Sequence, residues 1–543
     1  MHLSRVIFSL FALAAPLAGH LSAQPASEDN YIENAYFRSG HTEGIPNGWV
    51  RAGEEGTISL IREDDITFVR MVAEKPHQLV GIKQAVPMPE GVLGVVFEAR
   101  FRNENVKFGK NFLRDARTRF WFEDAEGNKI KAKTGDVIFD SHAQEWRNIS
   151  KEFLVPENAK ILNVLVCLNR PKSGTLDVQA VRLSAMDEEK AKEKAMIPIL
   201  AAKKKAEDEK EVRQMIELPS KTLELHVEGN KLVDAKGNRV ILQGVNVPSL
   251  EWSYKGENIH RSMKVALVDW NANVVRLPVA AGFWFGRGKK KIESNDAEAY
   301  RTIVDEAVNM AAGQGKYLIL DLHSYGAPRE FAVEFWKDAA ARYANNPAVI
   351  FDLYNEPHGI SWDLWQNGGT KQVKNKKTKE TKTIEVVGMQ ALVDAVRSTG
   401  AKNLISASGV SYALNISGVL KGHALRDPGG NGIMYSTHFY NWHGGWQKHF
   451  LNVAEQYPVL VGEFGADKKK MSFIPAHHQE DPNTFIPDAL GMIQKYNLNW
   501  TAFSLHPKAT PVLIRNWNYE PTPFFGAYVK QALEGKTFEP GMR

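Results

Sequence analysis

The sequence predicts a protein of several domains, with an N-terminal all-β sandwich, a charged helical linker and a C-terminal (β/α)₈ barrel. Three observations support this division. At 543 residues, the chain is too long for a single hydrophobic core. Short strand-like runs dominate residues 30–185, and a stretch rich in lysine and glutamate follows at 187–218. Strand and helix patterns then alternate over residues 223–537.

Residues 1–23 have the pattern of a signal peptide. An apolar core runs from Val6 to Leu17, and Leu21-Ser22-Ala23 offers a cleavage site. This core is too short to span a bilayer, and no later apolar run reaches spanning length. We therefore expect a secreted or periplasmic protein with no membrane span. An uncleaved anchor is the disfavoured alternative.

Composition and charge narrow the classes of function. Hydrophobic residues at 43% and charged residues at 24% are typical of a globular protein. The formal charge of +5 is small, and no basic stripe interleaved with aromatics accompanies it. Nucleic acid is therefore not the expected partner. The single cysteine, Cys167, excludes disulfides within the chain and a multi-cysteine zinc site.

Residues 30–185 contain evenly spaced strand-like runs and polar turns, which is the pattern of a β-sandwich. The segments Asn34 to Phe37, Pro46 to Trp49 and Gly174 to Leu183 resemble the jelly-roll carbohydrate-binding modules attached to polysaccharide-degrading enzymes. The resemblance implies a sugar-binding module, in which Trp49 and Trp121 are candidate stacking faces. Both could equally be core residues, because tryptophan is mostly buried.

Residues 187–218 mix lysine, acidic residues and alanine, as in Glu188 to Ala195 and Lys203 to Lys210. These are strong helix formers, so we expect a charged helical linker. A coiled coil that binds a partner is disfavoured, because sustained heptads are missing.

From residue 223 onward, eight apolar strand-like runs alternate with helical patterns, as in a (β/α)₈ barrel. An open doubly wound sheet is disfavoured, since no glycine-rich phosphate loop follows the first run. The eight runs are Val240 to Val247, Asn273 to Val279, Tyr317 to His323, Val349 to Glu356, Asn403 to Gly409, Ile433 to Tyr440, Pro458 to Gly465 and Asn499 to Leu505.

Polar residues gather where these strands end, which is where barrel enzymes keep their chemistry. Glu356 ends the fourth run and Glu463 the seventh. Two carboxyl groups suit glycosidic bond cleavage, because one must hold a proton and the other must be ionised. Arg276 near Glu463 would keep that carboxylate charged, and Tyr440 could orient it. Apolar surroundings and the neighbouring charge would raise the pKa of Glu356.

Five motifs occur in the order found in glycoside hydrolase family 5, which residues 223–535 resemble. They are Val275-Arg276-Leu277-Pro278, Asp321-Leu322-His323, Leu353-Tyr354-Asn355-Glu356-Pro357, His438-Phe439-Tyr440 and Gly462-Glu463-Phe464-Gly465. The resemblance implies a retaining mechanism with Glu463 as nucleophile and Glu356 as acid/base, their carboxyl groups about 5–5.5 Å apart. It also implies that Asn355 holds the sugar 2-hydroxyl. The side chains expected to shape the subsite at the scissile bond are His323, His438 and Tyr440.

Aromatic residues determine the expected sugar contacts. The family usually has a tryptophan where Phe503 falls, as the floor beneath the sugar being cleaved, and Trp500 is the alternative floor. Tryptophans in loops after the strands are candidate platforms, and Trp284 and Trp442 are preferred. The others are Trp252, Trp362, Trp365, Trp446 and Trp517.

Two further patterns in the barrel region have possible functional roles. The lysine-rich segment Lys371 to Lys382 follows the acid/base strand and could contact an acidic polysaccharide, although a solvated surface excursion is favoured. His477-His478, near Glu480 and Asp481, lacks the spacing of a helical metal site. We therefore expect no metal and no cofactor.

The sequence thus predicts an exported, monomeric, retaining β-glycanase that hydrolyses a β-1,4-linked polysaccharide, with a glucan as the leading substrate. β-Mannan, xyloglucan and an exo-acting role are alternatives within the family. A non-catalytic polysaccharide-binding protein is disfavoured, because both Glu356 and Glu463 are present. A metal-dependent barrel hydrolase is disfavoured, because only His323 and His438 qualify as strand-end ligands.

Overall fold

The structure is a computed structural model that describes residues 30–107, 115–140, 143–287, 296–374 and 380–543. The chain divides into two compact units, Met1–Lys204 (unit 1) and Lys205–Arg543 (unit 2). The boundary falls within helix α1 (Glu188–Glu217), which makes up nearly all of the predicted charged segment 187–218. The expected signal peptide lies outside the described residues.

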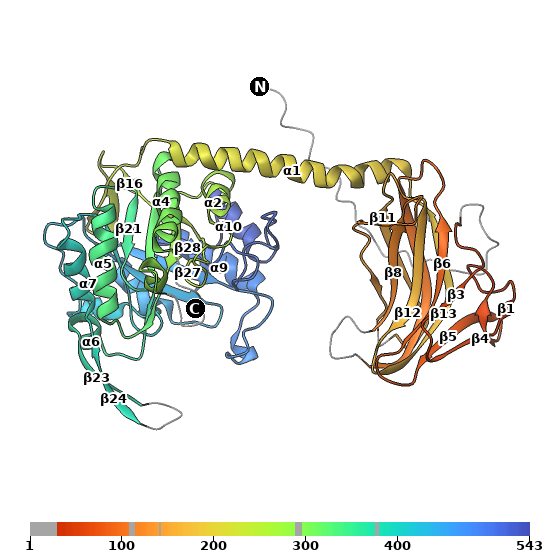
Figure 1. Ribbon diagram of the computed structural model, residues 1–543. Coiled ribbons are helices and arrows are strands. Elements are labelled where there is room, and N and C mark those ends of the chain that lie inside the picture. Colours follow the sequence, from red (N-terminus) through yellow and green to blue (C-terminus); the bar gives the residue numbers. More distant parts are fainter. Residues whose placement is uncertain (1–29, 108–114, 141–142, 288–295, 375–379) are drawn as a thin grey trace. The chain divides into compact units, whose positions relative to one another are not determined.

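Unit 1 is built from antiparallel strands in two main sheets, which confirms the predicted sandwich (Figure 1). One sheet has the order β10-β8-β12-β6-β3, with β9 paired to β8, and the other has the order β11-β7-β13-β5-β4. A small pair, β1 and β2, stands apart. The bounds are β1 His41–Thr42, β2 Ile45–Pro46, β3 Val50–Ala52, β4 Thr57–Glu63, β5 Ile66–Ala73, β6 Leu79–Pro87, β7 Gly94–Lys107, β8 Ala116–Glu123, β9 Lys129–Ile130, β10 Val137–Ile138, β11 Arg147–Leu154, β12 Ile161–Asn169 and β13 Ser173–Ala185.

Alternating side chains of these strands form the core of unit 1, as expected for sheets that bury one face. Trp49 belongs to this core. It is 5% exposed and packs edge-on against Phe37, with ring centroids 5.8 Å apart. Of the two roles left open for Trp49, the structure therefore supports the core residue and not the sugar-stacking face. Trp121 is only partly buried on the outside of β8.

The barrel of unit 2 is closed and consists of eight parallel strands, which confirms the predicted fold. Because the strands are parallel and closed by pairing of the first with the last, their carboxyl ends form one rim. The strands are β17 Gln243–Asn246, β18 Val274–Val279, β19 Tyr317–Leu322, β21 Val349–Asp352, β25 Ile405–Ser408, β26 Ile433–Tyr440, β27 Val459–Gly465 and β28 Asn499–Ala502.

Helices follow the strands and cover the barrel with apolar side chains (Figure 1). They are α2 Ile259–Lys264, α3 Ala281–Trp284, α4 Ala297–Gly313, α5 Glu330–Tyr343, α6 Trp362–Asn367, α7 Met389–Arg397, α8 Asn452–Ala454, α9 Pro482–Lys495 and α10 Gly526–Leu533. Short π and 3₁₀ segments are η1 Val265–Asp269, η2 Ser417–Lys421, η3 Gln447–Leu451 and η4 Ala476–His478. None of the described helices has both the length and the apolar composition that crossing a membrane requires.

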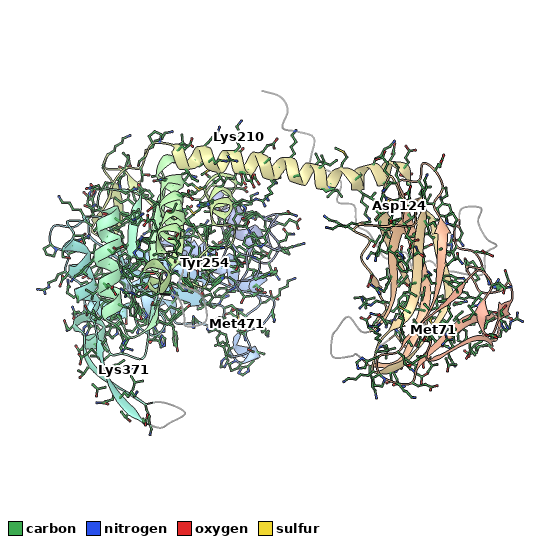
Figure 2. All side chains as sticks on the ribbon, viewed as in Figure 1. Met71, Asp124, Lys210, Tyr254, Lys371 and Met471 are labelled. Atoms are coloured by element: carbon green, nitrogen blue, oxygen red, sulfur yellow. The ribbon has the colours of Figure 1, made fainter. Side chains whose placement is uncertain are left out.

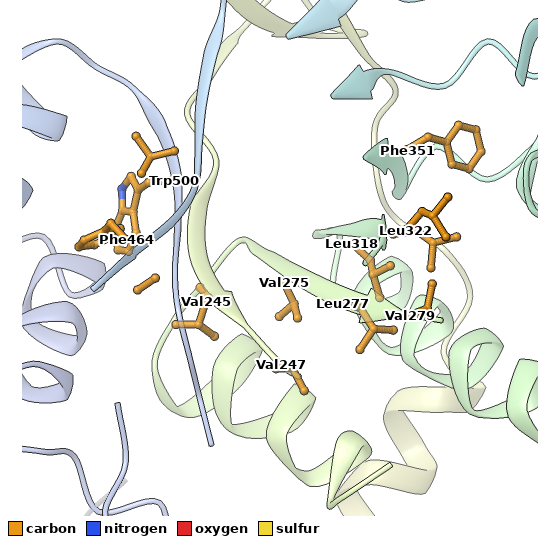
Figure 3. Packing of buried hydrophobic residues seen from close by; sticks show 14 of the residues in the cluster. Val245, Val247, Val275, Leu277, Val279, Leu318, Leu322, Phe351, Phe464 and Trp500 are labelled. Carbon is orange, nitrogen blue, oxygen red and sulfur yellow. The ribbon is translucent and has the colours of Figure 1, made fainter. Parts of the chain in front are cut away.

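Apolar side chains of neighbouring strands pack closely, as Figure 3 shows for Val275, Leu277 and Leu318. A small sheet, β14 Leu225–Glu228, β15 Lys231–Asp234 and β16 Arg239–Val240, precedes the barrel. Leu225 and Leu232 of this sheet join one apolar cluster with side chains from the barrel strands, among them Ile319.

The fourth strand differs from its prediction. Ladder pairing stops at Asp352, and Glu356 lies four residues further on, in a separate two-residue strand β22 (Glu356–Pro357). This strand pairs in parallel with β20 (Tyr325–Gly326), so the loops after two barrel strands are linked above the rim. The backbone thus holds Glu356 by its own short ladder.

The lysine-rich segment forms an antiparallel hairpin of β23 (Gly369–Lys374) and β24 (Thr381–Val386). Lys371 marks this hairpin, which extends from the body of unit 2 (Figure 2). Five of the six residues of β23 are exposed, and Lys371 is half-buried. Residues 375–379 lie outside the described part of the chain.

Candidate active site

A buried arginine organises the rim of the barrel. Arg276 of β18 is fully buried, which is costly for a charge unless it is paired. Its Nε donates to Asp352 at 2.9 Å, and one terminal nitrogen donates to Glu463 at 2.9 Å and to Asn246 at 3.0 Å. The other donates to the Asn355 side-chain oxygen at 2.8 Å. One guanidinium therefore orients groups from β17, from β27, and from β21 with the loop that follows it.

Acidic residues outnumber this one cation. Asp321 approaches Arg276 at 3.1 Å, so three carboxyl groups share the guanidinium. Burial opposes the charge of Arg276, but Asp321, Asp352 and Glu463 outweigh it and raise its pKa. Burial raises the pKa of Asp352 to about 7, despite the attraction of Arg276. The cluster therefore favours a proton on some of its carboxyl groups near neutral pH.

Glu463, at the end of β27, has a different partner on each carboxylate oxygen. Oε1 accepts from Arg276, and Oε2 accepts from the hydroxyl of Tyr440. Arg276 itself does not line the cavity that opens above the rim. Burial and the charge of Glu463 raise the pKa of Tyr440 well above its ordinary value, so the phenol keeps its proton and acts as a donor. These two donors orient and stabilise an ionised Glu463.

Glu356 has the opposite environment. Burial raises its pKa and the charge of Glu463 raises it further, to about 8. Its Oε1 lies 3.3 Å from Nδ1 of His438. Burial and the nearby cations lower the pKa of His438 well below its ordinary value, so this imidazole is neutral. Glu356 is consequently a carboxyl group that holds its proton near neutral pH.

The two glutamates lie close together. Ligand-type atoms of Glu356, His438 and Glu463 all fall within 4.8 Å of one another, so an oxygen of one carboxyl lies within that distance of the other. The described residues contain this one grouping of three donors that could hold a metal ion. A cation there would compete with the proton that the surroundings favour on Glu356.

His323 completes the rim near β19. Its Nδ1 lies 2.6 Å from Asp321, and its Nε2 lies 2.9 Å from the hydroxyl of Tyr325. Burial alone would lower the pKa of His323, but the charge and hydrogen bond of Asp321 raise it to about 9. A protonated His323 therefore adds a second positive charge beside the carboxyl groups.

A cavity of about 720 Å³ opens above these residues. Its aromatic wall continues onto Trp442, whose ring stacks on that of Tyr440 with centroids 5.0 Å apart. Met471 lies on a loop that extends from unit 2 and forms part of the wall (Figure 2). The lining residues are His323, Tyr325, Glu356, Tyr412, Tyr440, Trp442, His443, Glu463, Met471, Phe473, Ile474, Phe503, Thr510 and Pro511.

Comparison with known proteins places this barrel in a family. A family model described as cellulase, glycosyl hydrolase family 5, matches residues 233–509, just over half of the 543 residues. The chain belongs to glycosyl hydrolase family 5. The match covers all eight barrel strands, from β17 to β28, and both Glu356 and Glu463.

Several curated family 5 proteins are similar to this chain. Endoglucanase A of Butyrivibrio fibrisolvens is 29% identical over 252 residues, which is 44% of this chain and 52% of that protein. Cellulase CelDZ1 of Thermoanaerobacterium sp. is 24% identical over 347 residues, which is 58% of this chain and 82% of that protein. The chain thus spans about half the length of Endoglucanase A and more of CelDZ1. A crystal structure of β-glucanase SdGluc5_26A from Saccharophagus degradans is 23% identical with a TM-score of 0.47, covering 58% of this chain and 94% of that one.

The family 5 barrel brings together most of the residues chosen from sequence. Glu463 is bonded by Arg276 and Tyr440, and Glu356 lies beside His438. Asn355 is held by Arg276, and His323 lies beside this group. Trp442 and Phe503 both line the cavity.

Two expected sugar contacts are absent from the cavity. Trp284 is fully buried, packs against Phe335 and donates from its indole to Asp338 at 2.6 Å. Trp500 is 2% exposed and packs edge-on against Phe464, in the apolar cluster that the strands share with the helices. Both predictions are wrong, because these rings fill the space behind the strands. Trp365 and Trp446 are also fully buried.

Other site residues had weak sequence signals. Asp352 appears as a lone acid within an apolar strand, a buried charge that needed a partner. Tyr325, in the two-residue strand β20, and Tyr412 had no periodic pattern around them. Tyr412 lies between Ser411 and Ala413 in three successive left-handed residues, with φ near 60°, and stacks on the His358 ring at 3.8 Å.

Proposed function

We propose that this family 5 enzyme is a retaining β-glycosidase that cleaves a β-1,4-linked glucan within the 720 Å³ cavity. The observation that carries the proposal is the pair of glutamates, with oxygens within 4.8 Å and opposite surroundings. Retaining enzymes place their carboxyl groups about 5–5.5 Å apart, whereas inverting enzymes need about 6.5–9.5 Å to admit a water molecule. The observed spacing supports retention.

In the first step, Oε2 of Glu463 attacks the anomeric carbon, and the bond from that carbon to the glycosidic oxygen breaks. The proton of Glu356 passes to the leaving oxygen, so Glu356 becomes a carboxylate. Arg276 and Tyr440 hold Glu463 in place for the attack. Asn355, whose oxygen is fixed by Arg276, directs its amide nitrogen, buried and otherwise unpaired among the described residues, at the sugar 2-hydroxyl.

In the second step, water attacks the same carbon from the side of Glu356. Glu356 accepts a proton from this water, and the bond between the sugar and Glu463 breaks. Glu463 thereby regains its carboxylate, and Glu356 regains its proton. Glu463 carries no negative charge while it is bonded to the sugar. The pKa of Glu356 therefore falls in the covalent intermediate, where Glu356 is ionised, and is high in the free enzyme, where Glu356 holds its proton.

A β-1,4-glucan is the proposed substrate, because similar proteins bear the names endoglucanase and cellulase. The aromatic wall of Tyr440 and Trp442 offers apolar faces for pyranose rings. Phe503 has a smaller face than tryptophan, and for this reason β-mannan, xyloglucan and exo-acting cleavage remain the alternatives to be assayed. We also propose export of the protein and a sugar-binding role for unit 1.

The experiment is activity on a polysaccharide panel, comparing the parent with Glu463→Ala and Glu356→Ala. We expect the parent to release reducing ends from soluble β-1,4-glucan and Glu463→Ala to be inactive. Azide, which can enter the space left by the Glu463 side chain, should restore turnover of an activated glycoside. Undiminished cleavage by Glu463→Ala would refute the mechanism, and cleavage of mannan alone would refute the substrate.

A further inference from the structure

Unit 1 carries a partly buried tryptophan on the outer face of each main sheet, and their surroundings differ. On the five-stranded sheet, the Arg102 guanidinium lies 4.7 Å from the ring centre of Trp146. Arg102 pairs with Asp177 at 2.7 Å and with Glu63 at 2.9 Å. The charge of Arg102 is therefore neutralised by its neighbours, while the Arg100 guanidinium lies further from the same ring centre, at 5.8 Å.

On the other sheet, the ring of Trp121 lies between two ammonium groups. Nζ of Lys83 is 5.8 Å and Nζ of Lys129 is 5.6 Å from the ring centre. Among the residues that the structure describes, neither lysine forms an ion pair. The Trp121 indole donates to Glu123 at 2.9 Å, which fixes the ring orientation. This face thus presents an oriented aromatic ring beside two lysines that form no ion pair among the described residues.

Asn163 lies directly opposite Trp121 in the ladder between β12 and β8. Its neighbours Leu162 and Val164 point into the core, so Asn163 faces outward, as Trp121 does between Phe120 and Phe122. Asn163 is only 2% exposed, yet its Nδ2 has no hydrogen-bond partner within the described part of the chain. A buried donor without a partner is unfavourable and rare in folded proteins.

The adjacent row of the same face adds another cation. Leu165 stands opposite Arg119 on β8 and Lys83 on β6. Arg119 has a side chain that is 48% exposed, and its nearest acid, Asp136, is 3.7 Å away and also pairs with Arg117 at 2.7 Å. The face between β8 and β6 (Figure 1) therefore supplies donors and positive charge in excess of acceptors.

We propose that the outer face of β8, β12 and β6 binds an acidic glycan chain, an inference that rests on the sugar-binding role proposed for unit 1. Trp121 stacks on the apolar side of one sugar ring, and Asn163 Nδ2 donates to an oxygen of that sugar. Lys83 and Lys129 leave the indole ring and pair with carboxylate or sulfate groups of the chain. This exchange costs little, because an exposed cation–π contact is weak compared with a charge-assisted hydrogen bond.

The test is affinity electrophoresis of the full chain carrying Glu356→Gln, which protects the polymers from cleavage. Carboxymethyl cellulose and hydroxyethyl cellulose provide an acidic and a neutral polymer with the same backbone. Polygalacturonate and dextran sulfate then separate carboxylate from sulfate recognition. Retardation reports binding whether or not the chain cleaves glucan, so this readout does not depend on the proposed catalysis.

Trp121→Ala should weaken binding to the acidic polymers about tenfold, which corresponds to about 1.4 kcal/mol. Trp146→Ala is the matched control on the other sheet and should bind like the parent. Lys83→Gln should weaken binding and reduce its sensitivity to salt, and Lys83→Arg should restore both. Melting temperatures of all variants verify folding.

Three results would overturn the proposal. They are equal retardation by hydroxyethyl cellulose and carboxymethyl cellulose, unchanged binding by folded Trp121→Ala, and equal losses in Trp121→Ala and Trp146→Ala. The first would indicate neutral glycan binding, and the other two would show that the anion site lies elsewhere in the chain.

Discussion

The proton on Glu356 should make the stability of unit 2 depend on pH. The pKa of Glu356 rises from 4.5 to about 8 on folding, through burial and the charge of Glu463. The folded state therefore binds more protons than the unfolded state between these values. Stability contributed by this group is greatest below about pH 4.5 and falls as pH rises toward about 8.

Glu356→Gln removes this dependence, because glutamine is neutral at every pH and has nearly the shape of the protonated acid. The side chain is 14% exposed, so solvent screens it only partly. We compare the free energy of unfolding of the variant with that of the parent. At about 1.36 kcal/mol per pKa unit, this difference should be about 2–4 kcal/mol more favourable to the variant at about pH 8 than at about pH 5. The amide can still bond Nδ1 of the neutral His438.

The assay is urea unfolding of parent and variant at the two pH values, followed by tryptophan fluorescence. Glu385→Gln, on the exposed part of β24, is the matched control and should leave the pH dependence unchanged. An equal stability difference between Glu356→Gln and the parent at both pH values would refute the reasoning. It would mean that Glu356 is ionised in the folded protein throughout this range.

Three further outcomes follow from the site. The value of kcat/KM should fall as pH rises through about 8, because ionised Glu356 cannot protonate the leaving oxygen. This alkaline fall in the pH profile should vanish in Glu356→Gln, assayed with a substrate that has an activated leaving group. Arg276→Met should lower kcat by about 10²–10³-fold and destabilise unit 2 by about 3–5 kcal/mol, since it leaves buried carboxylates unpaired, and kinetics with thermal unfolding will check both effects. Trp284→Ala should lower the free energy of unfolding by about 3–5 kcal/mol and leave KM unchanged, because this ring is buried. Trp442→Ala should raise KM about tenfold with little change in melting temperature, because this ring lines the cavity. A raised KM in Trp284→Ala would contradict the placement of these rings.

The barrel and the two glutamates could be predicted because each depended on a local signal. Apolar runs that stop at a polar residue mark buried parallel strands, and the motifs around Arg276, Glu356 and Glu463 occur at such ends. The opposite environments of the two glutamates followed from general electrostatics. The exact end of the fourth strand could not be predicted, because pairing of Glu356 with Tyr325 depends on a loop elsewhere in the chain.

The direction in which a tryptophan points was the least predictable feature. Trp284 follows β18 in the chain, as a substrate platform would, but the short helix α3 turns it toward Phe335 and away from the cavity. Trp500 lies three residues before Phe503, and the alternation along β28 directs it outward against Phe464. In unit 1, Trp49 is in the core, whereas Trp121 is outside it because it alternates along β8 with the core residues Phe120 and Phe122.

The most direct test of the account is to trap the covalent intermediate. An activated 2-deoxy-2-fluoro-β-cellobioside should react through its anomeric carbon with the nucleophile, and the fluorine slows hydrolysis of the resulting ester. The account predicts one added fluorocellobiosyl group by intact mass, located by peptide mapping on Glu463. Inactivation without an adduct, or an adduct on any residue other than Glu463, would contradict it.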